Sequence, residues 1–90
     1  MTALRRDVRI INQRGLHARA SATFVNMASS LDAQIEVEKD GHKVSGTSIM
    51  GLMMLGAGMG DTITIHVSGD NAEDALQKLS TLIDDKFGED

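Results

Sequence analysis

Residues 62–87 read TITIHVSGDNAEDALQKLSTLIDDKF, and the spacing of their apolar side chains changes once along this stretch. Polar and apolar residues alternate in the first seven positions, which is the period of a strand with one buried face. Apolar residues then recur at helical spacing from Ala72 to Phe87, so they line one face of a helix. Asp70 or Asn71 is expected to cap this helix, and Asp70 with Glu73 three positions later has the spacing of a capping box. The stretch therefore predicts a strand followed by a capped helix.

The segments before this stretch show the same two periods. Alternation of apolar and polar residues predicts strands, and apolar residues at helical spacing predict helices. The dipeptide Asp-Gly favours a two-residue hairpin turn, and Ser or Thr before an apolar run is typical of a helix N-cap. The expected elements are a strand through Val8 and Ile10 that ends at the turn 12–15, a helix from Ala18 to Ser29 or Ser30, two strands around Asp40-Gly41, and a short apolar helix after Thr47-Ser48.

The predicted order of elements is βαββαβα in a chain of 90 residues. A chain of this length has apolar surface for only one core, so we expect a single domain over residues 1–90. Strands with one polar face need their helices on the other face. The fold class is therefore α+β: a two-layer open-faced β-sandwich, with a four-stranded antiparallel sheet covered on one face by three helices.

Composition excludes several functions. The formal net charge is −4, and two Phe without Trp or Tyr offer no aromatic platform for bases, so nucleic acid is a poor partner. The lack of Cys excludes a disulfide framework and a thiolate metal site. The sequence also lacks the long apolar runs of signal peptides and membrane spans. We expect a cytoplasmic protein with no cofactor, no metal and no membrane insertion.

His17 stands between a turn closed by Gly15 and the predicted helix that begins at Ala18. Unpaired backbone N–H groups and the positive end of the helix dipole make such a place an anion site, and Arg14 and Arg19 add positive charge. A neutral imidazole nitrogen there is a competent nucleophile, and the same surroundings would stabilise a phosphoryl group. On position alone, an ordinary loop histidine at a helix start is favoured, and the flanking arginines shift the balance toward an anion site.

The other candidate motifs favour structural roles. His42 and His66 have no ligand spacing with His17 and are expected on the solvated surface, so no metal site is predicted. The glycine-rich residues 56–60 follow a helix and precede a strand, the reverse of the order in phosphate-binding loops, and are expected to be a helix stop and a turn. A methionine group in the short helix favours the core, although not every member can face inward. The group consists of Met50, Met53 and Met54.

Two motifs resemble those of the HPr family, the phosphocarriers of the bacterial phosphoenolpyruvate-dependent phosphotransferase system. Gly15-Leu16-His17-Ala18-Arg19 is similar to the family's active-site signature, and Thr47-Ser48-Ile49-Met50-Gly51-Leu52-Met53 is similar to its regulatory serine motif and following helix. The resemblance implies that His17 accepts a phosphoryl group at Nδ1 from enzyme I and passes it to an enzyme IIA, while Arg19 neutralises charge. It also implies that an HPr kinase/phosphorylase phosphorylates Ser48. The protein would be a monomeric phosphoryl carrier rather than a multiple-turnover enzyme.

A donor and an acceptor that both reach His17 must share one docking face. An apolar patch with a charged rim suits such transient docking. The residues expected on this face are Ala18, Arg19, Thr23, Ile49, Met50 and Met53.

The sequence departs from the family pattern at two places. Ala20 stands where the family commonly has Pro, and Asn26 and Ser29 occupy the first helix where well-known members carry Lys. A weaker match to acidic partner surfaces would fit a nitrogen-related regulatory branch rather than sugar transport. Two other functions compete with this one: a small-molecule-binding regulatory α/β domain, in which His17 has no covalent role, and an RNA-binding module, which would need a basic or aromatic sheet face that this sequence lacks.

Overall fold

A computed structural model describes residues 2–89 and has the predicted order of strands and helices, with one additional 3₁₀ turn near the end of the chain. The elements are β1 (Thr2–Arg9), α1 (Ala18–Ser30), β2 (Gln34–Lys39), β3 (His42–Ser45), α2 (Ile49–Met54), β4 (Thr62–Gly69), α3 (Ala72–Asp84) and η1 (Lys86–Gly88).

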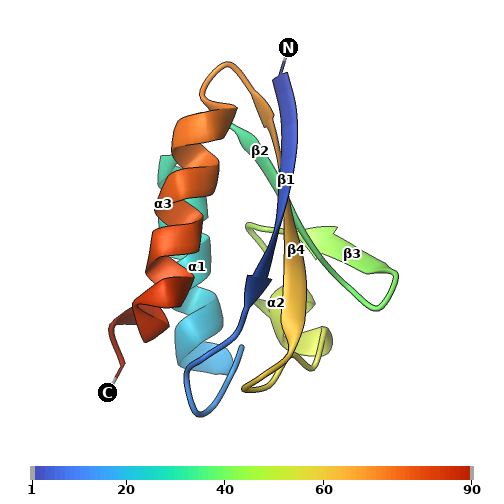
Figure 1. The fold of residues 1–90 in the computed structure, drawn as a ribbon, viewed down its shortest axis with the longest axis vertical. Helices are drawn as coiled ribbons and strands as arrows, with labels where there is room; N and C mark the ends of the chain where they lie inside the picture. Colours follow the sequence, from blue (N-terminus) through green and yellow to red (C-terminus); the bar gives the residue numbers. More distant parts are fainter. Residues whose placement is uncertain (1, 90) are drawn as a thin grey trace.

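The strands form one antiparallel sheet in the order β1-β4-β2-β3, with α1 and α3 side by side against one face (Figure 1). β1 pairs with β4 from Thr2 opposite Gly69 to Arg9 opposite Thr62. The short helix α2 contacts α1 and β3. The α+β open-faced sandwich expected from the alternating strands is confirmed.

The core lies between the sheet and the helices. β4 alternates buried and less buried residues along its length, and Ile65 is fully buried at its centre. Phe24 and Ala20 of α1 and Leu79 of α3 are also fully buried. Each large apolar side chain removed from water in this way stabilises the fold by about 1.5–3 kcal/mol. The core therefore fixes α1, whose N-cap is His17.

The two ends of α3 follow the sequence-based prediction only in part. The N-cap is Asn71, one of the two expected residues, but its side chain makes no capping hydrogen bond, and the capping box of Asp70 and Glu73 does not form. The helix ends at Asp84 and does not continue to Phe87. Phe87 still enters the core, because a positive φ of 56° in η1 turns its side chain inward after the helix has ended.

Residues 2–89 contain no helix that is both long and apolar enough to cross a membrane. In the same range, His, Cys, Asp and Glu side chains form no group of three or more that could hold a metal ion.

Candidate functional site

The loop between β1 and α1 is held against the glycine-rich residues 56–60. The Leu16 N–H donates to the Ala57 carbonyl at 2.9 Å, and the Gly60 N–H donates to the Ile10 carbonyl at 2.8 Å. Gly15 has a φ of +62°, and a Cβ at this position would lie 2.3 Å from the Ala57 carbonyl oxygen. Only glycine fits this approach. As predicted, residues 56–60 are a helix stop and a turn, and they also support the loop that leads to His17.

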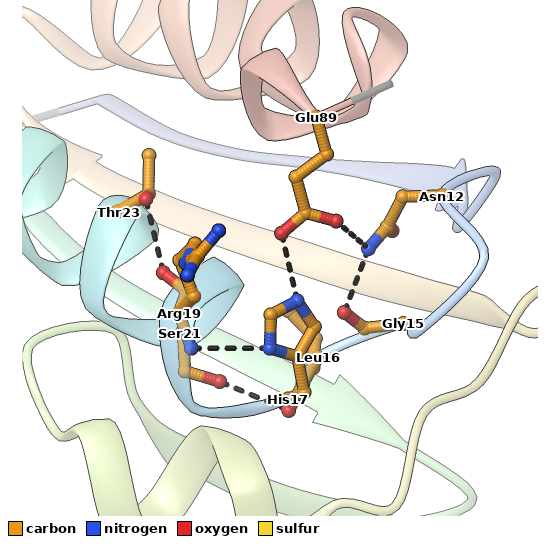
Figure 2. Close-up of polar contacts among 8 residues, drawn as sticks. All are labelled: Asn12, Gly15, Leu16, His17, Arg19, Ser21, Thr23 and Glu89. Carbon is orange, nitrogen blue, oxygen red and sulfur yellow. Dashed lines mark hydrogen bonds and ion pairs between the residues drawn. The ribbon is translucent and has the colours of Figure 1, made fainter.

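His17 is the half-buried N-cap of α1, and both of its ring nitrogens have partners (Figure 2). Nδ1 accepts the Arg19 backbone N–H at 3.2 Å. Nε2 lies 2.7 Å from Oε2 of Glu89. Because Nδ1 accepts a hydrogen bond, the ring proton belongs on Nε2, which then donates to the carboxylate. The geometry leaves an unprotonated Nδ1 at the start of a helix.

Asn12 and Glu89 complete the polar cluster around His17. The fully buried Asn12 donates through Nδ2 to the Gly15 carbonyl at 2.9 Å and to Oε1 of Glu89 at 3.1 Å. Burial of the Glu89 carboxyl raises its pKa. Hydrogen bonds from His17 and Asn12, together with the electrostatic attraction of the His17 ring and of the Arg19 cation, outweigh this effect, so the pKa of Glu89 lies below its ordinary value. Glu89 is therefore held as a carboxylate against the Nε2 side of the ring.

Neither of these residues was predicted from the sequence. Asn12 belongs to the polar turn after the first strand, where Asn is common, and nothing local distinguishes it from its neighbours. Glu89 is 72 positions from His17, beyond the end of α3. Because the apolar periodicity predicted a helix through Phe87, it did not predict the turn that brings Glu89 back to His17. Local sequence patterns do not predict a contact between residues so far apart in the chain.

The first turn of α1 holds the other predicted residues. Ala18 and Arg19 are exposed, and the half-buried Thr23 donates its hydroxyl to the Arg19 carbonyl at 3.0 Å. The buried Ser21 fixes the start of the helix, since its N–H donates to the His17 carbonyl at 2.9 Å. The Arg19 side chain is thus on the surface beside His17, within reach of an incoming partner.

Ser48 is the N-cap of α2, as the sequence suggested. Its Oγ accepts the Gly51 N–H at 3.0 Å. Gly51, which donates this hydrogen bond, is a poor helix former inside the helix. A Cβ there would lie 3.0 Å from Ser48 Oγ and 3.2 Å from Val44 Cβ, so the small residue leaves room for the cap.

Most of the surface of α2 is apolar. The prediction that its methionines favour the core is wrong, because Leu52 is the buried residue of this helix and Met50, Met53 and Met54 are all exposed. Ile49 is exposed as well. Since α1 packs against α2, an exposed apolar patch lies on the helix next to the one that begins at His17. We call Ile49, Met50, Met53 and Met54 the α2 patch.

The other histidines lie outside this cluster. His42 is exposed, as expected. His66 is not simply solvated: it is half-buried, and its Nε2 lies 2.7 Å from Oε1 of Glu38. Its neighbours Ile65 and Val67 point into the core, so His66 stands on the open face of the sheet. Glu38 is its partner on that face.

Comparisons with a family profile, with related sequences and with solved structures all point to the same family. A family profile described as "PTS HPr component phosphorylation site" matches residues 4–85. The phosphocarrier protein HPr of Cupriavidus necator is 44% identical over 86 residues, which cover 96% of this chain and 97% of the relative. The phosphocarrier protein NPr of Shewanella violacea is 45% identical over 89 residues, 99% of this chain and 98% of the relative. The crystal structure of HPr-C-His from Thermoanaerobacter tengcongensis matches with a TM-score of 0.90 and 44% identity, and the match covers 100% of this chain and 99% of that one.

Proposed function

The chain belongs to the HPr family of the phosphotransferase system, and we propose that it carries a phosphoryl group on Nδ1 of His17. Phosphorylated enzyme I is the donor and an enzyme IIA is the acceptor. The observation that carries the proposal is the hydrogen bond from the Arg19 N–H to Nδ1, since a nitrogen that accepts this bond carries no proton and has the lone pair that a nucleophile needs.

The start of α1 suits the product as well as the nucleophile. In the transfer, Nδ1 forms a bond to phosphorus while the bond between phosphorus and the donor breaks, and the electron pair of that bond returns to the donor. Backbone N–H groups of a first helical turn then face the phosphoryl oxygens. The Arg19 guanidinium, exposed in this structure, supplies charge-assisted hydrogen bonds once the phosphoryl group has arrived.

The test is incubation with phosphoenolpyruvate and enzyme I, followed by intact mass and by acid treatment. The protein should gain one acid-labile phosphoryl group. His17→Ala should abolish the gain, whereas His42→Ala and His66→Ala should retain it. Phosphorylation of the His17→Ala protein at the normal rate would overturn the proposal.

Arg19 should act in transfer more than in folding, because its side chain is exposed and its proposed partner exists only in the phosphorylated state. Arg19→Ala should slow transfer at matched ionic strength. Arg19→Lys should be slower than wild type too, since it keeps the charge but loses the planar fork. Equal transfer rates in all three proteins would remove Arg19 from the mechanism.

We propose that both partners dock on the start of α1 together with α2, through Ala18, Arg19, Thr23, Ile49, Met50 and Met53. The exposed apolar side chains beside a charged residue support this, as does the contact between the two helices. Titration of isotopically labelled protein with enzyme I and with an enzyme IIA should perturb overlapping amide resonances. Separate sets of perturbed resonances would contradict a shared face.

We further propose that phosphorylation of Ser48 lowers transfer through His17. The hydroxyl caps α2, and a phosphate there would put negative charge at the positive end of the helix, so the fold should tolerate it. The charge would also lie next to the apolar Ile49 and Met50, which favours a loss of docking. Ser48→Asp should imitate the effect in part. Unchanged transfer in both Ser48→Asp and enzymatically phosphorylated protein would leave Ser48 as a helix cap alone.

A further inference from the structure

The end of the chain is folded back by an unusual backbone. Lys86, Phe87 and Gly88 have φ values of 55°, 56° and 75°, so three consecutive residues are left-handed and two of them are not glycine. Non-glycine residues rarely adopt this conformation, and they keep it only where the surroundings enforce it. Here the buried Phe87 anchors the turn, and η1 contacts both α1 and α3.

The result of this turn is the placement of Glu89. The Glu89 N–H donates to the Lys86 carbonyl at 2.9 Å, which closes the turn. One carboxylate oxygen then lies 2.7 Å from Nε2 of His17, and the other accepts from the buried Asn12 at 3.1 Å. Figure 2 shows the Glu89 side chain descending onto the ring from the C-terminal turn, with Asn12 beside it. The side chain of Glu89 is 20% exposed, so it is largely withdrawn from water.

We propose that Glu89 is a positioning residue for phosphoryl transfer: its carboxylate keeps the His17 proton on Nε2, and it pairs the positive charge of the ring while the phosphoryl group is on Nδ1. The inference rests on the proposed function of His17. It assigns a role to a part of the chain, η1 and the residue after it, that lies far in sequence from both motifs.

Both the arrival of the phosphoryl group at Nδ1 and its departure require a proton on Nε2. When phosphorus bonds to Nδ1, no proton leaves His17, so the ring becomes a cation with its remaining proton on Nε2. The Glu89 carboxylate balances this charge at hydrogen-bond distance. When the group moves on, the Nδ1–phosphorus bond breaks and its electron pair returns to Nδ1, which leaves a neutral imidazole. Without the proton on Nε2 the leaving group would be an imidazolate anion, which is far more basic and therefore a worse leaving group.

The position of Glu89 avoids repulsion with the phosphoryl group. The carboxylate lies on the Nε2 side, whereas the phosphoryl group attaches to Nδ1, near the Arg19 N–H. Asn12 donates to the same carboxylate and to the Gly15 carbonyl, so it ties Glu89 to the loop that carries His17. A histidine oriented by a carboxylate that is itself held in place is a general device for fixing the tautomer of a functional imidazole.

Two substitutions separate hydrogen bonding from charge. Glu89→Gln keeps an oxygen that can accept from Nε2 but loses the negative charge, and Glu89→Ala loses both. Glu36→Gln is the matched control, because it makes the same chemical change at an exposed residue of β2. ¹⁵N NMR of the imidazole reports the tautomer of His17 in the unphosphorylated protein. Phosphoryl transfer from enzyme I, and onward to enzyme IIA, is measured by rapid quench.

Glu89→Ala should lose the preference for the Nε2–H tautomer and should slow transfer by about tenfold or more, as removal of the carboxylate partner of a functional histidine commonly does. Glu89→Gln should keep the tautomer and transfer at an intermediate rate, and Glu36→Gln should equal wild type. Wild-type transfer rates in Glu89→Ala would overturn the inference while leaving phosphorylation of His17 intact. Slower transfer by Glu89→Ala with an unchanged His17 tautomer would also overturn it. Failure of the proposed function is a distinct result, since the wild-type protein would then acquire no phosphoryl group on His17.

Discussion

Replacement of Gly15 by alanine should destabilise the protein beyond the cost of the backbone conformation. The φ of +62° is in the left-handed region, where a Cβ costs about 1–2 kcal/mol. The new Cβ would also lie 2.3 Å from the Ala57 carbonyl oxygen and 2.7 Å from Gly58 Cα. Both are backbone atoms, and the carbonyl also accepts the Leu16 N–H. Overpacking of this kind costs about 1–3 kcal/mol, so the total loss should be about 2–5 kcal/mol.

Equilibrium unfolding in urea measures this loss. With a slope of about 1–2 kcal/mol per molar urea, a loss of 2 kcal/mol moves the midpoint down by about 1–2 M. Gly56→Ala is the matched control: its φ is +65°, and a Cβ there meets no heavy atom within 4 Å. This variant should show the backbone cost alone. Equal losses of unfolding free energy in the two variants would refute the reasoning, because the close approach of Ala57 to Gly15 would then have no effect on stability.

Three further predictions concern the polar groups of the site. Ser48→Ala should lower the free energy of unfolding by about 1 kcal/mol, because the Gly51 N–H loses its acceptor; urea unfolding at equal slope checks it, and no loss would mean that water replaces the cap. Asn12→Ala should cost about 1–3 kcal/mol, because the Gly15 carbonyl and Glu89 lose a donor; thermal unfolding checks it, and a neutral result would refute this role. Since the pKa of Glu89 is lower in the folded than in the unfolded state, its ionised form stabilises the fold above the unfolded pKa, and this contribution disappears as the pH falls through the folded pKa. The stability difference between wild type and Glu89→Gln should therefore shrink in the acid range, and a constant difference would contradict the shift.

The features that the sequence predicted well are those with a local physical cause. The period-two pattern of β4 matches its register with β1 and β2, because one face of that strand is buried along its length. Asp40 and Gly41 have φ values of 51° and 84°, the left-handed pair that a tight hairpin turn needs and that Asp-Gly supplies. The N-caps at His17 and Ser48 were likewise visible as changes of pattern before each helix.

What the sequence did not reveal depends on contacts between distant segments. The glycines at 56–60 signalled a helix stop, but their role as a support for Gly15 requires the loops to meet in space. Phe87 matched the apolar face of α3, and its inward position was correct although the helix had ended. Packing against α1 and α3 enforces the left-handed backbone of η1, so the local conformational preferences of Lys86 and Phe87 do not predict it.

The composition of α2 separates its role in folding from the role proposed for its surface. Of its six residues, four are exposed and apolar, and Leu52 is the one that is buried. Such a helix gains little from burying its own side chains, so its stability depends on the Ser48 cap and on contacts with α1 and β3. Large exposed apolar patches are uncommon on proteins that act alone, which supports the proposal that partners dock on the α2 patch. A charge added at Ser48 would thus act on a helix that contributes little to the core and much to the exposed surface. Its effect should appear as a loss of affinity for the partner, while the unfolding temperature changes little.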